Sequence, residues 1–104
     1  MTDPREGAGA GVKERTSTKE REPTLYQVVL LNDDYSTMDF VIRVLEEVFA
    51  KSPAEAYRIM MQVHVDGRGI AGVYTHEVAE TKAETTVDNA REAGHPLLAS
   101  VEEA

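Results

Sequence analysis

The stretch LLNDDYSTM, residues 30–38, determines where the first strand of this chain ends and its first helix begins. It closes an apolar run and then places three polar side chains in succession, Asn32, Asp33 and Asp34. Asn and Asp favour turns because their side chains bond to nearby backbone groups. The stretch therefore predicts a strand, a turn and a helix, and its three side chains offer oxygen acceptors to a cation or an amine.

The residues on either side of this turn carry the periodicity of regular elements. A nearly continuous apolar run over residues 25–31 predicts a central strand. After the turn, Ser36 or Thr37 is a candidate N-cap, and Asp39 stands where it would complete a capping box with Ser36. Apolar residues at i, i+3, i+4 and i+7 then predict a helix over residues 38–50.

A second helix is announced by its own start signal. Ser52 can cap it, Pro53 suits its first turn, and Glu55 stands at the third position. His64 lies close to the end of this helix, and the sequence DGRG at residues 66–69 breaks it.

The last third of the chain predicts two strands with a helix between them. The strands are expected over residues 70–75 and 97–101, with Thr75 as a candidate cap of the helix and Gly94 at its end. The face of the helix expected to pack on a sheet is made of small residues, Ala79, Ala83, Val87 and Ala90.

This order of elements predicts an α+β class, a two-layer βααβαβ domain over residues 25–104. The final strand–helix–strand unit makes its two strands parallel if they share a sheet. The apolar first strand fits between them, antiparallel to both. We therefore expect a three-stranded antiparallel sheet of the split βαβ type, packed against three helices.

Charge and apolar content divide the chain at residue 24. Residues 1–24 contain five basic and five acidic residues and few apolar ones, which predicts a disordered, flexible N-terminal arm. Residues 25–104 contain 6 basic and 14 acidic residues and so carry the net charge of −8. An acidic body of this kind argues against nucleic acid as a partner and favours a cationic one.

Three further features of composition restrict the class of protein. The chain has no cysteine, so neither disulfides nor thiolate chemistry is available to it. No apolar run approaches the ~20 residues of a membrane span, and the N-terminus lacks the apolar segment of a signal peptide. We expect a cytoplasmic protein without a membrane contact.

Four segments, in the same order along the chain, resemble the ClpS family, the adaptors of the bacterial ClpAP protease. The likeness covers residues 25–104, with Thr37 at a position where the family usually has proline. The segments are LLNDDYSTMDFV (30–41), VHVDG (63–67), GVYTHEVAETK (72–82) and HPLL (95–98).

The resemblance implies a monomeric adaptor without enzymatic activity and without a cofactor. Such adaptors recognise N-degrons, which are substrates with a bulky apolar N-terminal residue such as Leu, Phe, Tyr or Trp. They deliver these substrates to the N-terminal domain of the ClpA unfoldase. By this resemblance, the residues that contact the unfoldase are Tyr35, Glu77 and Lys82.

The resemblance also implies a pocket for the first side chain of the substrate. Met38 acts as a gate that discriminates against the β-branched side chains of Ile and Val. The pocket residues are Ser36 at the rim, Met38, Val41, Met60, Val63 and Leu97.

The chemistry of an amino terminus suits the polar residues that the sequence offers. An α-amino group is mostly an ammonium ion at neutral pH and has three donors. The Asn32 carbonyl oxygen, the Asp33 carboxylate and a neutral His64 nitrogen would meet them. A protonated His64 would lose its acceptor, so we expect binding to weaken in acid.

Each of these signals has a plainer interpretation when it stands alone. An Asn-Asp-Asp sequence is most often an ordinary turn, and a lone histidine at a helix end is most often structural. Asp33, Asp34 and His64 could instead collect a metal ion, as could His76 with Glu80, although no second histidine completes a zincin pattern. A stalk-like interaction domain would share the βααβαβ order.

Overall fold

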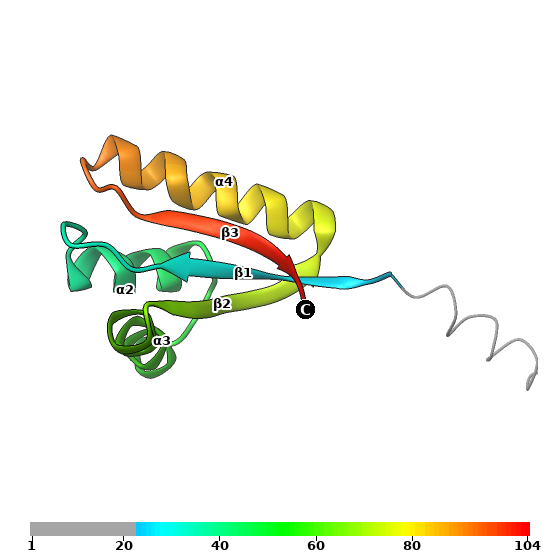
Figure 1. Ribbon diagram of the computed structural model, residues 1–104, viewed down its shortest axis with the longest axis horizontal. Helices are drawn as coiled ribbons and strands as arrows, with labels where there is room; N and C mark the ends of the chain where they lie inside the picture. Colours follow the sequence, from blue (N-terminus) through cyan, green and yellow to red (C-terminus); the bar gives the residue numbers. More distant parts are fainter. Residues whose placement is uncertain (1–22) are drawn as a thin grey trace, which may run out of the picture.

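The computed structural model describes residues 23–104, so the predicted arm over residues 1–24 lies outside the described residues except for Pro23 and Thr24. Figure 1 shows a single sheet with its helices. This is the predicted α+β class with the predicted βααβαβ order. The elements are β1 (Leu25–Leu31), α2 (Met38–Glu47), α3 (Pro53–Asp66), β2 (Arg68–Thr75), α4 (His76–Glu92) and β3 (Leu98–Glu103).

The sheet has the strand order β2-β1-β3, with β1 antiparallel to both neighbours, which confirms the prediction (Figure 1). Val28 of β1 lies opposite Gly72 of β2 and Val101 of β3. The register between β1 and β2 shifts after Val28, and the extra residue on β2, Ala71, is fully buried. The bulge places Ala71 and the following Gly72 both in buried positions, while Ile70 before them is exposed.

The central position of β1 explains its apolar sequence. Val28, Val29 and Leu30 are all 0% exposed. Helix α4 contacts all three strands, α3 contacts β2, and α2 packs against α3. The apolar core therefore lies between the sheet and the three helices and includes Val28, Leu30, Phe40, Val44, Leu45, Ile59, Ala79 and Ala90.

The start of α2 differs from the prediction in one detail. Thr37, and not Ser36, is the N-cap, and its Oγ1 accepts a hydrogen bond from the Phe40 backbone N–H at 3.1 Å. The predicted capping box of Ser36 with Asp39 was wrong, because the Ser36 backbone N–H donates to Asp33 Oδ1 instead. The helix also ends at Glu47, before the predicted residue 50, and Ala50 has a left-handed φ of 56°.

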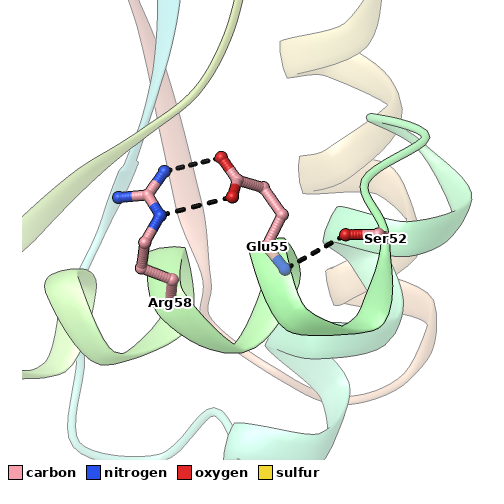
Figure 2. A network of polar contacts seen from close by, with 3 residues as sticks. All are labelled: Ser52, Glu55 and Arg58. Atoms are coloured by element: carbon pink, nitrogen blue, oxygen red, sulfur yellow. Dashed lines mark hydrogen bonds and ion pairs between the residues drawn. The ribbon is translucent and has the colours of Figure 1, made fainter.

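The start signal of α3 is confirmed, and Figure 2 shows its contacts. Ser52 Oγ accepts a hydrogen bond from the Glu55 backbone N–H at 3.2 Å. The Glu55 carboxylate binds the Arg58 guanidinium, with its shorter contact at 2.7 Å. Glu55 is thus occupied by the next turn of the helix.

Helix α4 buries a different residue from the one predicted. Ala79, Ala83 and Ala90 are buried as expected, but Thr86 is 0% exposed while Val87 is only partly buried. The Thr86 hydroxyl donates to the Lys82 carbonyl oxygen at 2.9 Å, which satisfies its buried polar group. The predicted cap, Thr75, occupies the N-cap position but makes no side-chain hydrogen bond.

The ends of the last two strands also move relative to the prediction. β2 begins at Arg68, two residues earlier than expected, and β3 runs from Leu98 to Glu103. Gly94, with φ 81°, follows the end of α4 as predicted. Leu97, which was predicted to begin β3, precedes it.

Candidate functional site

A backbone hydrogen bond joins the two segments that the sequence suggested as one site. The Asn32 N–H, just after β1, donates to the Gly67 carbonyl oxygen at 3.0 Å. Gly67 caps the end of α3 with a φ of 86°, and its own N–H donates to the Val63 carbonyl oxygen. The loop after β1 is therefore tied to the last turn of α3, which carries His64.

The loop after β1, helix α2 and helix α3 line a cavity of about 240 Å³. This volume is below the roughly 300–1,000 Å³ of common small-molecule pockets, so it suits one amino-acid side chain with its amino group. The polar residues of the lining come from the loop and from His64, and the apolar residues come from α2 and α3. The lining residues are Asn32, Asp33, Asp34, Ser36, Met38, Val41, Met60, Val63 and His64.

All three residues predicted to hold an amine, Asn32, Asp33 and His64, line this one cavity. Five of the six residues predicted for the side-chain pocket line it as well. The exception is Leu97, which is 2% exposed and belongs to the core cluster. Conversely, the prediction for the amine left out Asp34, although it belongs to the same run of acceptors and also lines the cavity.

Asp33 has a structural task as well as a place in the lining. Its Oδ1 accepts hydrogen bonds from the backbone N–H groups of Tyr35 and Ser36, at 2.8 and 2.6 Å. Partial burial alone would raise the pKa of the Asp33 carboxyl, but these bonds and the nearby His95 outweigh it and hold the pKa below its ordinary value. Asp33 is therefore ionised at neutral pH.

Two polar atoms near the cavity have no partner within residues 23–104. They are Asp33 Oδ2 and Ser36 Oγ, and both are buried. A buried polar atom without a hydrogen bond costs about 1–3 kcal/mol. Because both residues line the cavity, a donor brought in by a ligand would be able to satisfy them.

The apolar side of the cavity combines a fixed floor with an adaptable edge. Val41, Met60 and Val63 are each at most 6% exposed and are part of the core cluster. Met38, at the first turn of α2, is 48% exposed. A flexible thioether at this place can adjust to side chains of different shape.

The three residues predicted to contact an unfoldase are in different environments. Tyr35 is 79% exposed on the loop, and Glu77 is exposed at the start of α4. Lys82 is half-buried, and its Nζ donates to the Val48 carbonyl oxygen, the C-cap of α2, at 2.8 Å. The same Nζ lies 5.3 Å from the centre of the Tyr74 ring.

Glu77 also lines a second, larger hollow. It is an open groove of about 840 Å³ between α4 and β3. Glu80 and Glu84 line it too, and its apolar residues include Val87 and Val101.

The metal-binding alternative gains nothing from the geometry. Within residues 23–104, no group of three or more His, Asp or Glu side chains is placed to hold a metal ion. His76 Nε2 lies 3.3 Å from Glu80 Oε2, and the His76 ring packs edge-on against the Tyr26 ring.

None of the helices in this described part of the chain is long and apolar enough to cross a membrane.

Comparison with known proteins gives consistent matches. A family model described as "ATP-dependent Clp protease adaptor protein ClpS" matches residues 21–100. The chain is 54% identical over 97 residues to the ATP-dependent Clp protease adapter protein ClpS of Maricaulis maris, covering 93% of this chain and 87% of the relative. It is 50% identical over 107 residues to the protein of the same name from Phenylobacterium zucineum, covering 98% of both.

A solved structure is similar in fold as well as in sequence. It is that of Agrobacterium tumefaciens ClpS2 bound to L-phenylalaninamide. The TM-score is 0.77 and the sequence identity is 42%. The similarity covers 80% of this chain and 100% of the other.

Proposed function

The chain belongs to the ClpS family of Clp protease adaptors, and we propose that it recognises its substrates by a bulky hydrophobic N-terminal residue. As a ClpS protein it is an adaptor and not an enzyme. The proposed ligands are free amino termini that begin with Leu, Phe, Tyr or Trp. The proposed recipient of the substrate is the ClpA unfoldase of the ClpAP protease.

One observation carries this proposal: a single cavity is lined by amine acceptors on one side and by apolar side chains on the other. L-phenylalaninamide, the compound bound to the similar Agrobacterium protein, has the two features that such a cavity would recognise. It has a free α-amino group and a large apolar side chain. We extend this mode of binding to the present chain.

The amino group is proposed to bind on the polar side. Its three donors would meet the Asn32 side-chain oxygen, the Asp33 carboxylate and a His64 nitrogen. The unpartnered Asp33 Oδ2 supports this assignment, because an ammonium donor would satisfy it. Asp34, which also lines the cavity, adds a second negative charge for the ammonium.

The first side chain of the substrate is proposed to enter the apolar side. Val41, Met60 and Val63 form its floor, and Met38 and Ser36 lie at its edge. Burying a Leu or Phe side chain contributes about 1.5–3 kcal/mol. Leu97 is buried in the same core cluster as Val41, Met60 and Val63, and we propose that it contributes to the pocket from there.

Delivery is proposed to use a separate surface. Tyr35 and Glu77 are exposed and available to the N-terminal domain of ClpA. Lys82 is used within the molecule, so its contribution is to hold α2 against α4. We propose that the protein acts in the cytoplasm, where ATP is supplied to an ATP-dependent protease, and that it acts as a monomer.

A binding series over all twenty N-terminal residues tests the proposal. Peptides that differ only in their first residue would be titrated into the protein, each with an N-acetylated partner as its control. We expect tight binding for Leu, Phe, Tyr and Trp, and a loss of at least tenfold on acetylation, which removes the positive charge and two donors. Equal binding of acetylated and free peptides would exclude recognition of the amino terminus.

A further inference from the structure

The charge of the candidate site is entirely negative. Its nine lining residues include two aspartates, Asp33 and Asp34, and neither lysine nor arginine. The ion pairs found within residues 23–104 join other residues and leave both of these aspartates without a basic partner. Asp33 stays ionised because its loop donates hydrogen bonds to it.

The two aspartates are not equivalent toward a ligand. Asp33 Oδ1 is committed to the backbone N–H groups of the loop, which fixes that carboxylate in place. Asp34 is exposed, and it accepts no hydrogen bond from the described residues around it. Among residues 23–104, the Asp34 carboxylate therefore has neither an ion-pair partner nor a hydrogen-bond partner.

One source of positive potential beside the loop, the N-terminus of α2, is itself opposed by an acid. Helix α2 begins at Met38, and the N-terminus of a helix attracts anions. Asp39, however, lies in the first turn of α2, and the Phe40 N–H is already bonded to Thr37. An anionic ligand group near Asp34 would find little to offset the repulsion.

Free amino acids carry an anionic group at just this place. In phenylalanine the carboxylate carbon is attached to the same Cα as the ammonium nitrogen, about 2.5 Å away. In a peptide or an amino-acid amide the corresponding group is a neutral carbonyl. An ammonium bound between Asp33 and Asp34 would therefore hold the carboxylate of a free amino acid close to two like charges.

We infer that this site distinguishes the first residue of a protein chain from the same residue as a free amino acid, with Asp34 as the specificity-determining residue. The inference rests on the proposed function and narrows its substrate class to an α-ammonium followed by an uncharged carbonyl. Free leucine and phenylalanine match the cavity in side chain and ammonium. Repulsion of their carboxylate keeps the cavity available for protein substrates.

A competition experiment with three small molecules tests the inference. L-phenylalaninamide, L-phenylalanine methyl ester and L-phenylalanine would displace a fluorescent peptide that begins with Phe from the full-length protein at pH 7 and low salt. The ester controls for the N–H donors of the amide group. Its carbonyl group is uncharged, like that of the amide, but carries no N–H. The amino group of the free acid is the most basic of the three, so its greater protonation works against the expected result.

We expect the amide and the ester to agree within about threefold and phenylalanine to bind at least tenfold more weakly. Added salt should narrow the gap, because screening shortens the range of the repulsion. Asp34→Asn should reduce the difference in affinity between phenylalanine and its amide at low salt. Asp88→Asn, the same charge change on α4, should leave this difference unchanged.

The outcomes separate the inference from the proposed function. Equal binding of phenylalanine and its amide, or a gap that salt does not change, overturns the inference. An unchanged gap in Asp34→Asn overturns the assignment to that residue. Failure of the amide, the ester and the peptide alike to bind overturns the proposed function itself.

Discussion

The residues of the loop after β1 divide their polar groups between the fold and the cavity. Asn32 uses its backbone N–H to reach Gly67 and Asp33 uses Oδ1 to hold the turn, while both residues also line the cavity. The plainer interpretation of this sequence as an ordinary turn was thus correct but incomplete. The same residues make the turn and line the cavity.

Met38 leads to the first prediction at the level of one residue. It is half exposed at the edge of a cavity whose floor is buried, so shortening it should make room near the Cβ of a bound side chain. We expect Met38→Ala to improve binding of peptides that begin with Ile or Val by about tenfold. Fluorescence anisotropy would measure this, with Met61→Ala on α3 as the control outside the lining. An unchanged preference would contradict a gating role.

The lowered pKa of Asp33 leads to a prediction for stability against pH. In the folded protein the pKa of the Asp33 carboxyl lies below its ordinary value of 3.8. Ionised Asp33 therefore stabilises the fold above about pH 4. That contribution is lost as the pH falls through the folded-state pKa. We expect Asp33→Ala to cost about 1–3 kcal/mol at pH 7 and less at pH 3 in urea unfolding.

A matched substitution keeps this prediction specific to the Asp33 carboxylate. Asp88→Ala removes an exposed carboxylate from α4 and should change stability by less than about 0.5 kcal/mol at pH 7. A cost of Asp33→Ala that stays constant from pH 7 to pH 3 would show that the loop does not depend on the charge.

Among the elements, α3 and β2 meet where the chain has no room for a side chain. A Cβ on Gly69 would come within 2.8 Å of Val63 Cγ2 and 3.2 Å of the Ile59 carbonyl oxygen. Val63 lines the cavity. We expect Gly69→Ala to cost about 1–3 kcal/mol and also to weaken peptide binding, since Val63 must move.

A substitution at Gly94 separates the loss of stability from the loss of peptide binding. Gly94→Ala meets no atom within 4 Å, but its φ of 81° is strained for alanine. It should cost about 1 kcal/mol without any change in peptide affinity. If both variants weaken peptide binding equally, loss of stability alone would explain the result for Gly69.

Helices α2 and α4 are joined by Lys82. Its ammonium group donates a hydrogen bond to the carbonyl oxygen of Val48, the C-cap of α2, and lies near the Tyr74 and Phe49 rings. We expect Lys82→Met to lower the free energy of unfolding by about 1–2 kcal/mol. Lys82→Arg should lower the free energy of unfolding by less, because it keeps the positive charge. Thermal and urea unfolding would measure it. Unchanged stability in Lys82→Met would instead favour a direct contact with the unfoldase.

The elements were predictable where their signals were local. The cap of α3, the glycine after α4 and the nearly continuous apolar run that made β1 central were read correctly from neighbouring residues. The errors lie where two signals compete: Ser36 and Thr37 were both good caps, and Thr86 and Val87 were both able to face the sheet. In each case a local hydrogen bond accompanies the observed choice: Asp33 Oδ1 accepts from the Ser36 N–H, and the Lys82 carbonyl oxygen accepts from the Thr86 hydroxyl.

At the scale of the whole molecule, the proposed substrate cavity and the proposed delivery surface occupy different places. The cavity lies between the β1–α2 loop and α3, whereas Glu77 lines the groove between α4 and β3. Binding and delivery should therefore be separable by mutation. This separation is the basis of the last prediction.

Glu77→Lys should abolish delivery and leave peptide affinity intact. Glu77 is exposed and does not line the cavity, so the change in stability should be limited to about 1 kcal/mol, from placing a positive charge in the first turn of α4. Degradation of a reporter that begins with Phe by ClpAP would measure delivery. Glu92→Lys, the same change at the far end of α4, is the control. Loss of peptide binding together with delivery would mean that Glu77 supports the fold.

The sequence by itself determined the α+β class, the order of the elements and the list of residues able to bind an amine, because periodicity, caps and side-chain chemistry are local properties. The tertiary structure decided which of them meet. The bond from Asn32 to Gly67 closes the loop on α3 and brings residues 32 and 64 to one cavity, while Leu97 lies in the core and Asp34 is exposed in the cavity lining. Such choices depend on contacts between residues far apart in the chain, and a linear pattern does not contain them.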